Sequence, residues 1–362
     1  MFDYNARWAR AREQMRTLGI DALVISPSQD MEYMTGCSQR YMGWTAFLVV
    51  TAHDIYFVVS AFELDMYLKT PAGQAECIGW GRGETGVDEL RALLAPCRTV
   101  AVCSQFLASH LLTLQEALPN VRWQNGDQIM SRLRVIKDAE EIRILREAQR
   151  AAEKALYRVF DEGIRGLTEH QAAEKIMRCR LELGFNSVKP GIVASGPGSA
   201  EPHHFNSDRI IQSGDIVMVD IGGVYQGYCA DITRTVAVDY VPEGFQKIYD
   251  LCLSAHMAAV RGAYPNMTCG ELDSLARKVI EDGGYGSNYM HSLGHGTGLS
   301  LHELPTINQG ITVPLAPGTV FTIEPGIYLP GKYGVRIEDL LVMADHGTET
   351  FNLSSKELTI VH

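Results

Sequence analysis

Ile216-Val-Met-Val-Asp220, followed by Ala230-Asp231-Ile-Thr-Arg-Thr235, is the stretch of sequence that decides the fold. Both runs are typical of strands, and the turn residues Tyr225-Gln226-Gly227 lie between them. In an antiparallel hairpin, residues equidistant from the turn face each other on one side of the sheet. We therefore expect the carboxylates of Asp220 and Asp231 to converge. Facing carboxylates destabilise a hairpin and resist ionisation, and a metal ion would remove that conflict.

A second pair of acids repeats this arrangement further along the chain. Val320-Phe-Thr-Ile-Glu324 and Gly334-Val-Arg-Ile-Glu338 are strand-like runs that end in glutamate, nearly symmetric about the turn-rich segment 330–334. Either acidic pair alone could be a solvated sheet surface. The two pairs together favour a shared site.

His295 is the fifth candidate ligand. It lies in His291-Ser-Leu-Gly-His295-Gly-Thr-Gly298, where glycines allow the backbone to approach another group closely. Four carboxylates carry a charge that two divalent cations balance, so the set predicts a dinuclear centre. Oxygen donors with one imidazole suit Mn²⁺, while Co²⁺, Zn²⁺ or Fe²⁺ stay open. Two such ions activate water and polarise a carbonyl group, and the expected reaction is therefore hydrolysis.

The composition of the chain narrows the class of protein. Its 362 residues are enough for two domains, and its formal net charge of -11 disfavours nucleic acid and anionic membranes as partners. The first sixteen residues carry charges where a signal peptide needs an apolar run, and no apolar run approaches the roughly 20 residues that span a bilayer. The eight cysteines include no C-x-x-C pair and are expected to be free thiols. We expect a soluble, cytoplasmic protein.

Local patterns predict two domains. Helix and strand patterns alternate over residues 1–125, which predicts a small α/β domain without an acidic or histidine cluster. Residues 126–137 are expected to form a linker. Residues 138–362 predict helices over a mostly antiparallel sheet, an α+β layering, with capping boxes at Asp138, Thr168 and Thr268 opening three of the helices.

These motifs resemble the metallopeptidase family of aminopeptidase P, prolidase and methionine aminopeptidase, which has the pita-bread fold. The matching stretches are Ser195-Gly-Pro-Gly-Ser-Ala-Glu-Pro-His203, Asp220-Ile-Gly, Asp231-Ile-Thr-Arg-Thr, Gly294-His-Gly-Thr-Gly, His302-Glu303, Ile323-Glu-Pro-Gly326 and Val335-Arg-Ile-Glu-Asp339. Residues 1–125 resemble the creatinase-N-like domain of the Xaa-Pro-cleaving branch. The resemblance covers nearly the whole chain.

The resemblance implies a role for each candidate residue. The implied metal ligands are Asp220, Asp231, His295, Glu324 and Glu338. The implied catalytic residues are His203, His291, His302, Glu324 and Arg336. Among these, Glu324 would take the proton from the attacking water, and His203 and His302 would hydrogen-bond the substrate and its tetrahedral intermediate. Arg336 would orient neighbouring carboxylates. His204 has no clear counterpart and is treated as structural or peripheral.

The implied activity is hydrolysis of Xaa-Pro peptide bonds, and the implied substrate is a peptide with proline in second position. The resemblance also implies a homodimer. Residues 303–323 contain no Arg or Lys, whereas dipeptide-restricted prolidases resemble one another in carrying an arginine there for the substrate carboxylate. This favours an Xaa-Pro aminopeptidase that accepts longer peptides. Glu201 stands where relatives often have an apolar residue.

Two other hypotheses for the activity stay open. An Xaa-Pro dipeptidase (prolidase) would differ mainly in how it holds the substrate carboxylate. A hydrolase or lyase of the same fold could act on a small non-peptide metabolite, since fold alone does not decide the substrate. A peptide-binding module of this fold would have lost its metal ligands, and all five are present here.

Overall fold

The computed structural model describes residues 2–37 and 46–362, and the chain divides into two compact units between Arg134 and Val135. Each unit has its own sheet and its own hydrophobic core. No helix within the described residues is long and apolar enough to cross a lipid bilayer.

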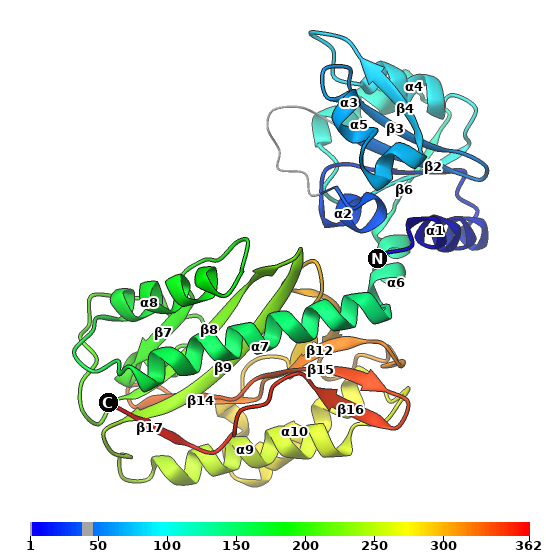
Figure 1. Ribbon diagram of the computed structural model, residues 1–362. Helices are drawn as coiled ribbons and strands as arrows, with labels where there is room; N and C mark the ends of the chain where they lie inside the picture. The colour runs from blue at the N-terminus through cyan, green and yellow to red at the C-terminus, as the bar shows by residue number, and fades with distance from the viewer. Residues whose placement is uncertain (1, 38–45) are drawn as a thin grey trace. The chain divides into compact units, whose positions relative to one another are not determined.

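The first unit is built on a six-stranded mixed sheet with strand order β4-β3-β2-β1-β5-β6 (Figure 1). Its strands are β1 (Ala22–Ile25), β2 (Phe47–Thr51), β3 (Ile55–Ser60), β4 (Glu76–Trp80), β5 (Thr99–Val102) and β6 (Arg122–Asn125). Its helices are α1 (Tyr4–Leu18), α2 (Gln29–Thr35), α3 (Leu64–Tyr67), η1 (Pro71–Gln74), α4 (Val87–Leu94), α5 (Ala108–Ala117) and α6 (Asp127–Val135). The central strand β1 is buried along its whole length, as its sequence Ala-Leu-Val-Ile predicts.

Helix α6 occupies most of the segment 126–137 that was expected to be a linker. The Leu133 carbonyl accepts a hydrogen bond of 2.9 Å from the Tyr33 hydroxyl, and Arg134 pairs with Asp30 at 2.8 Å. The buried apolar side chains of α6 are Ile129, Met130 and Leu133. These few positions are too close together to show a helical period in the sequence, and tertiary packing joins the helix to the first unit.

The second unit contains three sheets and four long helices. The sheets have the orders β17-β9-β8-β7, β11-β10-β12-β15-β16 and β13-β14. The helices are α7 (Ala139–Asp161), α8 (Glu169–Glu182), α9 (Phe245–Gly262) and α10 (Cys269–Asp282), with short turns η2 (Gly196–Ala200) and η3 (Gly286–Asn288). The strands are β7 (Ile192–Ser195), β8 (Ile216–Tyr225), β9 (Tyr228–Val238), β10 (Gly294–Gly296), β11 (Glu303–Ile307), β12 (Val320–Ile323), β13 (Gly326–Leu329), β14 (Tyr333–Arg336), β15 (Asp339–Ala344), β16 (Gly347–Thr350) and β17 (Thr359–Val361).

Each main sheet of this unit is covered by one pair of helices (Figure 1). Helices α7 and α8 pack on the sheet of β7, β8, β9 and β17. Helices α9 and α10 pack on strands that follow them in the sequence, among them β12, β13, β14 and β15. The capping boxes predicted at Asp138, Thr168 and Thr268 begin α7, α8 and α10. The predicted α+β layering therefore matches the observed one.

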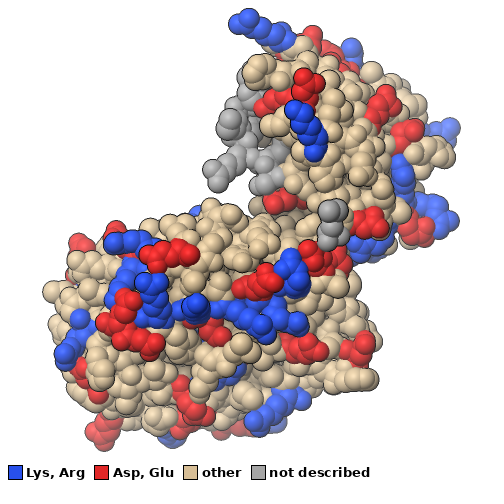
Figure 2. Space-filling model, viewed as in Figure 1, with Lys and Arg blue, Asp and Glu red and all other residues tan. Residues whose placement is uncertain are grey.

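Charged side chains of both signs lie side by side on the face of this unit shown in Figure 2. On α7, Arg143 pairs with Glu147 at 2.7 Å, and Arg158 pairs with Glu182 of α8 at 2.8 Å. Such exposed pairs contribute little to stability because water and salt screen them. Only the pair of Arg158 and Glu182 joins α7 to α8, and neither pair decides the fold.

The hairpin of β8 and β9 has a different register from the one expected. Its two-residue turn is Gln226-Gly227, both with positive φ, so Asp220 lies opposite Thr233 and Asp231 lies opposite Gly222. The two aspartates are therefore diagonal neighbours rather than directly opposed. Because side chains alternate along a strand, a shift of two residues keeps both carboxylates on one face.

The two glutamates lie where paired strands are interrupted. Ile323 pairs with Asp339 and Gly326 pairs with Arg336, which places Glu324 and Glu338 at opposing positions in the gap between these pairs. The strand-like run expected at 334–338 thus ends at Arg336 in β14, and a second strand, β15, begins at Asp339. The interruption frees both glutamate side chains from the regular pleat of the sheet.

Candidate metal centre

Asp231, His295 and Glu338 form the centre of the candidate site. Each offers one ligand atom, and these atoms all lie within 4.8 Å of one another. Asp231 comes from β9, His295 from β10, and Glu338 from the junction of β14 and β15. Residues separated by more than one hundred positions in the chain therefore meet at one point.

The other two predicted ligands border this group. The Glu324 Oε1 atom lies 3.4 Å from His295 Nε2, and Asp231 Oδ2 lies 3.5 Å from the same nitrogen. Asp220 forms a short ion pair with Arg336, whose Nε lies 4.0 Å from Glu324 Oε2. The structure thus brings all five predicted ligands together, with Arg336 beside them.

Glycine is required on both sides of His295. A side chain at Gly294 would place its Cβ 2.1 Å from the Thr322 carbonyl oxygen, and one at Gly296 would place it 2.2 Å from the Leu304 carbonyl oxygen. Neither backbone could yield without shifting β11 or β12. The glycines therefore allow β10 to lie tightly between its neighbours and present His295.

Three supporting side chains were not predicted from the sequence. Gln149 of α7 donates to the Asp231 carbonyl at 2.6 Å and accepts from the Asp231 N–H at 3.0 Å. The Thr233 hydroxyl donates to Glu338 Oε2 at 2.6 Å, and the Thr322 hydroxyl donates to Glu324 Oε1 at 3.0 Å. Each threonine stands two residues before or after a candidate ligand, a spacing that puts it on the same strand face and that could have revealed it.

Tyr328 connects two of the predicted catalytic residues. Its buried hydroxyl accepts a hydrogen bond from Arg336 Nη1 at 2.8 Å and lies 2.9 Å from His291 Nε2. His291 Nδ1 lies 2.7 Å from the Ser292 carbonyl oxygen, which makes Nδ1 the protonated nitrogen of a neutral ring. The Tyr328 hydroxyl can then donate to Nε2, so the ring is fixed in orientation.

The remaining predicted histidines stand at the exposed border of the site. The ring centroids of His302 and His295 are 4.1 Å apart. His203 lies close enough to His291 to contribute, after burial and the charge of Arg336, to the lowering of the His291 pKa to about 4. His203 and His302 are both exposed. They are the members of the set that a substrate entering from solvent would meet.

Burial, and then repulsion from neighbouring carboxylates, raises the pKa values of the buried acids. Burial, followed by the charges of Asp220 and Glu324, raises the pKa of Asp231 well above its ordinary value. Burial and the charge of Asp231 do the same to the pKa of Glu338. Burial raises the pKa of Glu324 to about 7, although Arg336 opposes the shift. One guanidinium does not balance four carboxylates.

This donor set fits divalent metal ions. Four carboxylates supply hard oxygen donors, and burial and the charge of His302 lower the pKa of His295 to about 4, so its imidazole is neutral at pH 7. A cation in the group would remove the mutual repulsion that raises the pKa values of the acids. The residues that could hold metal are therefore the five predicted from the sequence: Asp220, Asp231, His295, Glu324 and Glu338.

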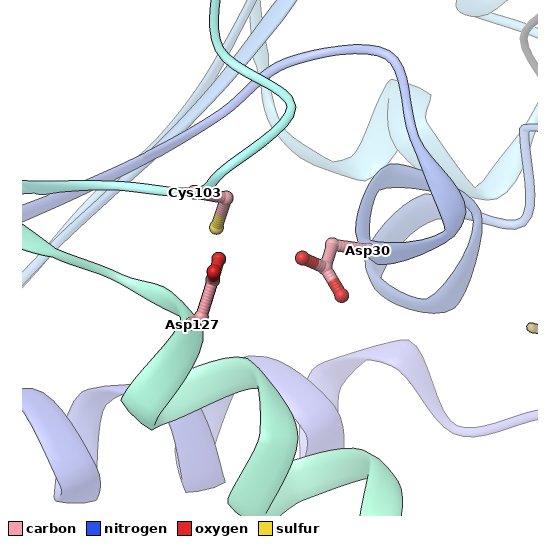
Figure 3. A group of neighbouring side chains, drawn as sticks. All are labelled: Asp30, Cys103 and Asp127. Carbon is pink, nitrogen blue, oxygen red and sulfur yellow. The ribbon is translucent and has the colours of Figure 1, made fainter. Parts of the chain in front are cut away.

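The first unit contains a smaller group that the sequence did not predict. The ligand atoms of Asp30, Cys103 and Asp127 lie within 4.8 Å of one another, and Figure 3 shows these side chains gathered at the start of α6. Asp30 is already paired with Arg134 at 2.8 Å. Burial, then the charge of Asp30, raises the pKa of the Cys103 thiol well above its ordinary value, which opposes formation of the thiolate that binds metals.

Two family profiles match the chain in the same two regions. The profile described as Creatinase/Prolidase N-terminal domain matches residues 7–136, and the profile of metallopeptidase family M24 matches residues 143–345. The chain belongs to metallopeptidase family M24. The family resemblance and the enzyme class inferred from the sequence motifs are thereby confirmed.

Individual members of the family align over almost the whole chain. A protein named "Probable dipeptidase PepE" from Mycobacterium tuberculosis is 35% identical over 364 residues, which cover 99% of this chain and 96% of that protein. An Xaa-Pro dipeptidase from Pyrococcus furiosus is 38% identical over 345 residues, covering 94% and 95%. The crystal structure of dipeptidase PepE from Mycobacterium ulcerans has a TM-score of 0.92 and 36% identity, and the match covers 99% of each chain. The predicted pita-bread fold with its amino-terminal α/β domain is confirmed.

Proposed function

We propose that this metallopeptidase hydrolyses the peptide bond that precedes proline, with two divalent ions held by Asp220, Asp231, His295, Glu324 and Glu338. The observation that carries the proposal is the convergence of these five residues, among them acids whose pKa values are raised by burial and mutual repulsion. The specificity for proline is supported by the name of the Pyrococcus furiosus relative, Xaa-Pro dipeptidase. Burying several negative charges is costly unless they are paired or bind metal, so we interpret this group of acids as a cation site.

Different side chains of the site have different roles in hydrolysis. Divalent ions in this donor set supply Lewis acidity, which lowers the pKa of water and polarises a carbonyl group. Glu324 takes the proton of the attacking water, because it lies beside the centre, with its Oε1 3.4 Å from His295 Nε2, and accepts a hydrogen bond from Thr322 that orients it. Arg336 holds Asp220 and stays close to Glu324. Its positive charge reduces the repulsion between these two carboxylates.

The exposed histidines of the site act on the substrate. His203 and His302 lie at the solvent border, where they can hydrogen-bond the peptide and stabilise negative charge that develops on its carbonyl oxygen. His291 is held by Tyr328 and Ser292 and keeps its ring orientation fixed. The site thus combines a buried group of acids with a border of hydrogen-bonding histidines.

For the length of the substrate we propose an Xaa-Pro aminopeptidase, which releases the amino-terminal residue of a longer peptide. Its support is the absence of Arg and Lys from residues 303–323, which leaves this segment without a cation for the carboxylate of a dipeptide. An Xaa-Pro dipeptidase is the second candidate, and the names of the relatives favour it. We propose Mn²⁺ as the preferred metal, with Co²⁺, Zn²⁺ and Fe²⁺ as alternatives, and a homodimer as the assembly.

A panel of substrates separates these candidates. Purified protein loaded with Mn²⁺ is assayed on Xaa-Pro dipeptides, Xaa-Pro-Yaa tripeptides, matched Xaa-Ala peptides and a small non-peptide amide. We expect hydrolysis of the tripeptides, loss of activity with chelator and recovery with Mn²⁺ or Co²⁺. Faster cleavage of dipeptides would assign a dipeptidase. Equal rates on proline and alanine peptides would refute the proline specificity, and activity that survives exhaustive metal removal would refute the metal mechanism.

A further inference from the structure

The carboxylate of Glu169 joins the two ends of the segment that carries His203. Glu169 is the first residue of α8 and its side chain is fully buried. Its Oε1 accepts hydrogen bonds from the N–H and the hydroxyl of Ser195, at 2.8 and 2.6 Å. Its Oε2 accepts hydrogen bonds from the N–H and the hydroxyl of Ser207, at 2.9 and 2.7 Å. Residues 196–206, which we call the His203 segment, are thus closed into a loop by one side chain.

His204 lies between two carboxylates inside this loop. Its Nε2 is 2.9 Å from Glu169 Oε2, and its Nδ1 is 2.9 Å from Glu201 Oε2. A neutral imidazole carries one N–H and can donate to one carboxylate only, so its second nitrogen would turn a lone pair toward an anion. An imidazolium donates to both. The geometry is therefore that of a protonated histidine.

The surroundings of His204 strengthen this arrangement. The His204 side chain is 14% exposed and that of Glu169 is fully buried, which limits screening of this ion pair by water, whereas Glu201 is 69% exposed and its ion pair with His204 is more open to water. Burial by itself lowers the pKa of His204, but the hydrogen bonds to Glu169 and Glu201 outweigh burial and the pKa is raised. The next charged groups outward are Arg209 and Asp215, which form a two-point ion pair with each other, and Arg209 also donates to the Ser195 hydroxyl.

The His203 segment is also tied to the candidate metal centre. The Pro202 carbonyl accepts a hydrogen bond from Arg336 Nη1 at 3.2 Å, and the Ser199 hydroxyl accepts one from the N–H of Gly334 at 2.9 Å. His203 therefore stands between Pro202, which is held by Arg336, and His204, which is held by Glu169 and Glu201. Loosening either neighbour would move His203.

We propose that the imidazolium of His204, held between Glu169 and Glu201, is a positioning device that fixes His203 at the metal centre. The inference rests on the proposed function for its catalytic consequence, because His203 is there assigned to the substrate. It gives roles to two residues whose purpose the sequence left open, His204 and the unusual Glu201. As pH rises through the pKa of His204, the ring loses a proton, one carboxylate loses its donor, and the segment loosens.

The ionisation of His204 can be measured directly. Protein with isotope-labelled histidine, loaded with diamagnetic Zn²⁺, is titrated by NMR, and His204 is assigned through His204→Gln. We expect His204 to titrate above the value of about 6.5 of an unperturbed histidine. Glu201→Gln keeps an acceptor oxygen but removes the charge, and it should lower this value by about one unit. Titration at or below about 6.5, or no change in Glu201→Gln, would overturn the proposal.

A matched control comes from the exposed pair His170 and Asp208, whose side chains are 3.3 Å apart. Asp208→Asn removes a carboxylate beside a histidine in the same region, and the titration of His204 should stay as in the wild type. Glu201→Ala removes both the charge and the acceptor and should lower the value at least as far as Glu201→Gln. A shift of equal size in Asp208→Asn would show that general surface charge, rather than the ion pair, governs His204.

The catalytic consequence is tested by the pH profile of kcat/KM on an Xaa-Pro-Yaa peptide. We expect the alkaline limb of Glu201→Gln to move to lower pH by the same amount as the NMR titration, about one pH unit. In the affected pH range this is up to a tenfold loss of kcat/KM. Rates at pH 6 and metal content should be unchanged. An NMR shift without movement of the alkaline limb would refute the positioning role. If the wild type cleaves no such peptide, the proposed function fails while the NMR result still decides the state of His204.

Discussion

The two clusters of metal-binding residue types in this molecule differ in how their charge is balanced. In the first unit, Asp30 of the Asp30, Cys103 and Asp127 group has Arg134 at 2.8 Å. In the catalytic unit, four carboxylates surround His295, and Arg336 is the guanidinium that contacts them. Two clusters with similarly short distances between their side chains therefore have different roles. The first group is a structural ion pair with a neighbouring thiol, and the second is destabilised until a cation enters.

Loss of Asp231 is expected to have the largest effect. Asp231→Ala removes a donor from the centre, and both bound metal and peptidase activity should fall by at least about a hundredfold, since even partners of ligands can cost that much. Metal content after gel filtration and initial rates measure the two effects.

Cys103→Ser is the matched control for this variant. It alters the group in the first unit, and metal content and activity should stay at the wild-type level. Full metal content in Asp231→Ala, or metal loss in Cys103→Ser, would reverse the assignment of the two clusters.

Breaking the ion pair of the first unit should affect stability and leave metal content unchanged. Asp30→Asn removes the carboxylate beside the nearly buried Arg134, and the free energy of unfolding of this unit should fall by about 4 kcal/mol. Urea unfolding measures the change. The control is Glu13→Gln, which breaks the exposed pair with Arg16 and should cost no more than about 1 kcal/mol. Equal effects of the two variants would contradict the structural role of Arg134.

The metal-free protein should lose stability as pH rises. The folded-state pKa of Glu324 is about 7, above the value of about 4.3 in an unfolded chain, so the folded state holds the extra proton between these values. Stability contributed by this proton is present below pH 4 and is lost as pH approaches 7, by on the order of 3 kcal/mol. Thermal unfolding with chelator at pH 5 and pH 7.5 measures this loss. Added Mn²⁺ should raise the melting temperature more at pH 7.5. A metal-free protein that is more stable at pH 7.5 would contradict a Glu324 pKa raised by burial and by the charge of Asp220.

Loss of one supporting hydroxyl should have the smallest effect. Thr233→Val keeps the shape of the side chain but removes its 2.6 Å hydrogen bond to Glu338 and the 3.2 Å hydrogen bond that it accepts from Arg336 Nε, and metal affinity should fall about tenfold. Competition with a fluorescent chelator measures the affinity. Thr348→Val, which removes a hydrogen bond to the Val260 carbonyl, is the control and should leave it unchanged. An unchanged affinity in Thr233→Val would show that Glu338 is oriented by other contacts.

The sequence was most informative where a local pattern determines local structure. Capping boxes placed the starts of three helices, and apolar runs ending in acids located the strands around Asp220 and Glu324. The register of the hairpin was less predictable, because the turn lies at Gln226-Gly227 and shifts the pairing so that Asp231 faces Gly222. Period-two alternation kept both acids on one face despite that shift.

No local pattern in the sequence predicted the contacts between distant segments. Gln149 reaches Asp231 from another layer, Tyr328 joins His291 to Arg336, and Asp30 meets Cys103 and Asp127 in a domain where no cluster was expected. Helix α6 was missed for the same reason, since its few apolar positions become a helix face only against the first unit.

The sequence by itself determined the types of the elements, the family and the five candidate ligands, because periodicity, capping and motif spacing are written in neighbouring residues. Only the tertiary structure decided which side chains support those ligands and which cluster keeps its charge unbalanced. The reason is physical. Hydrogen bonding, burial and charge pairing depend on distances in space, and those distances are set when helices and sheets pack together.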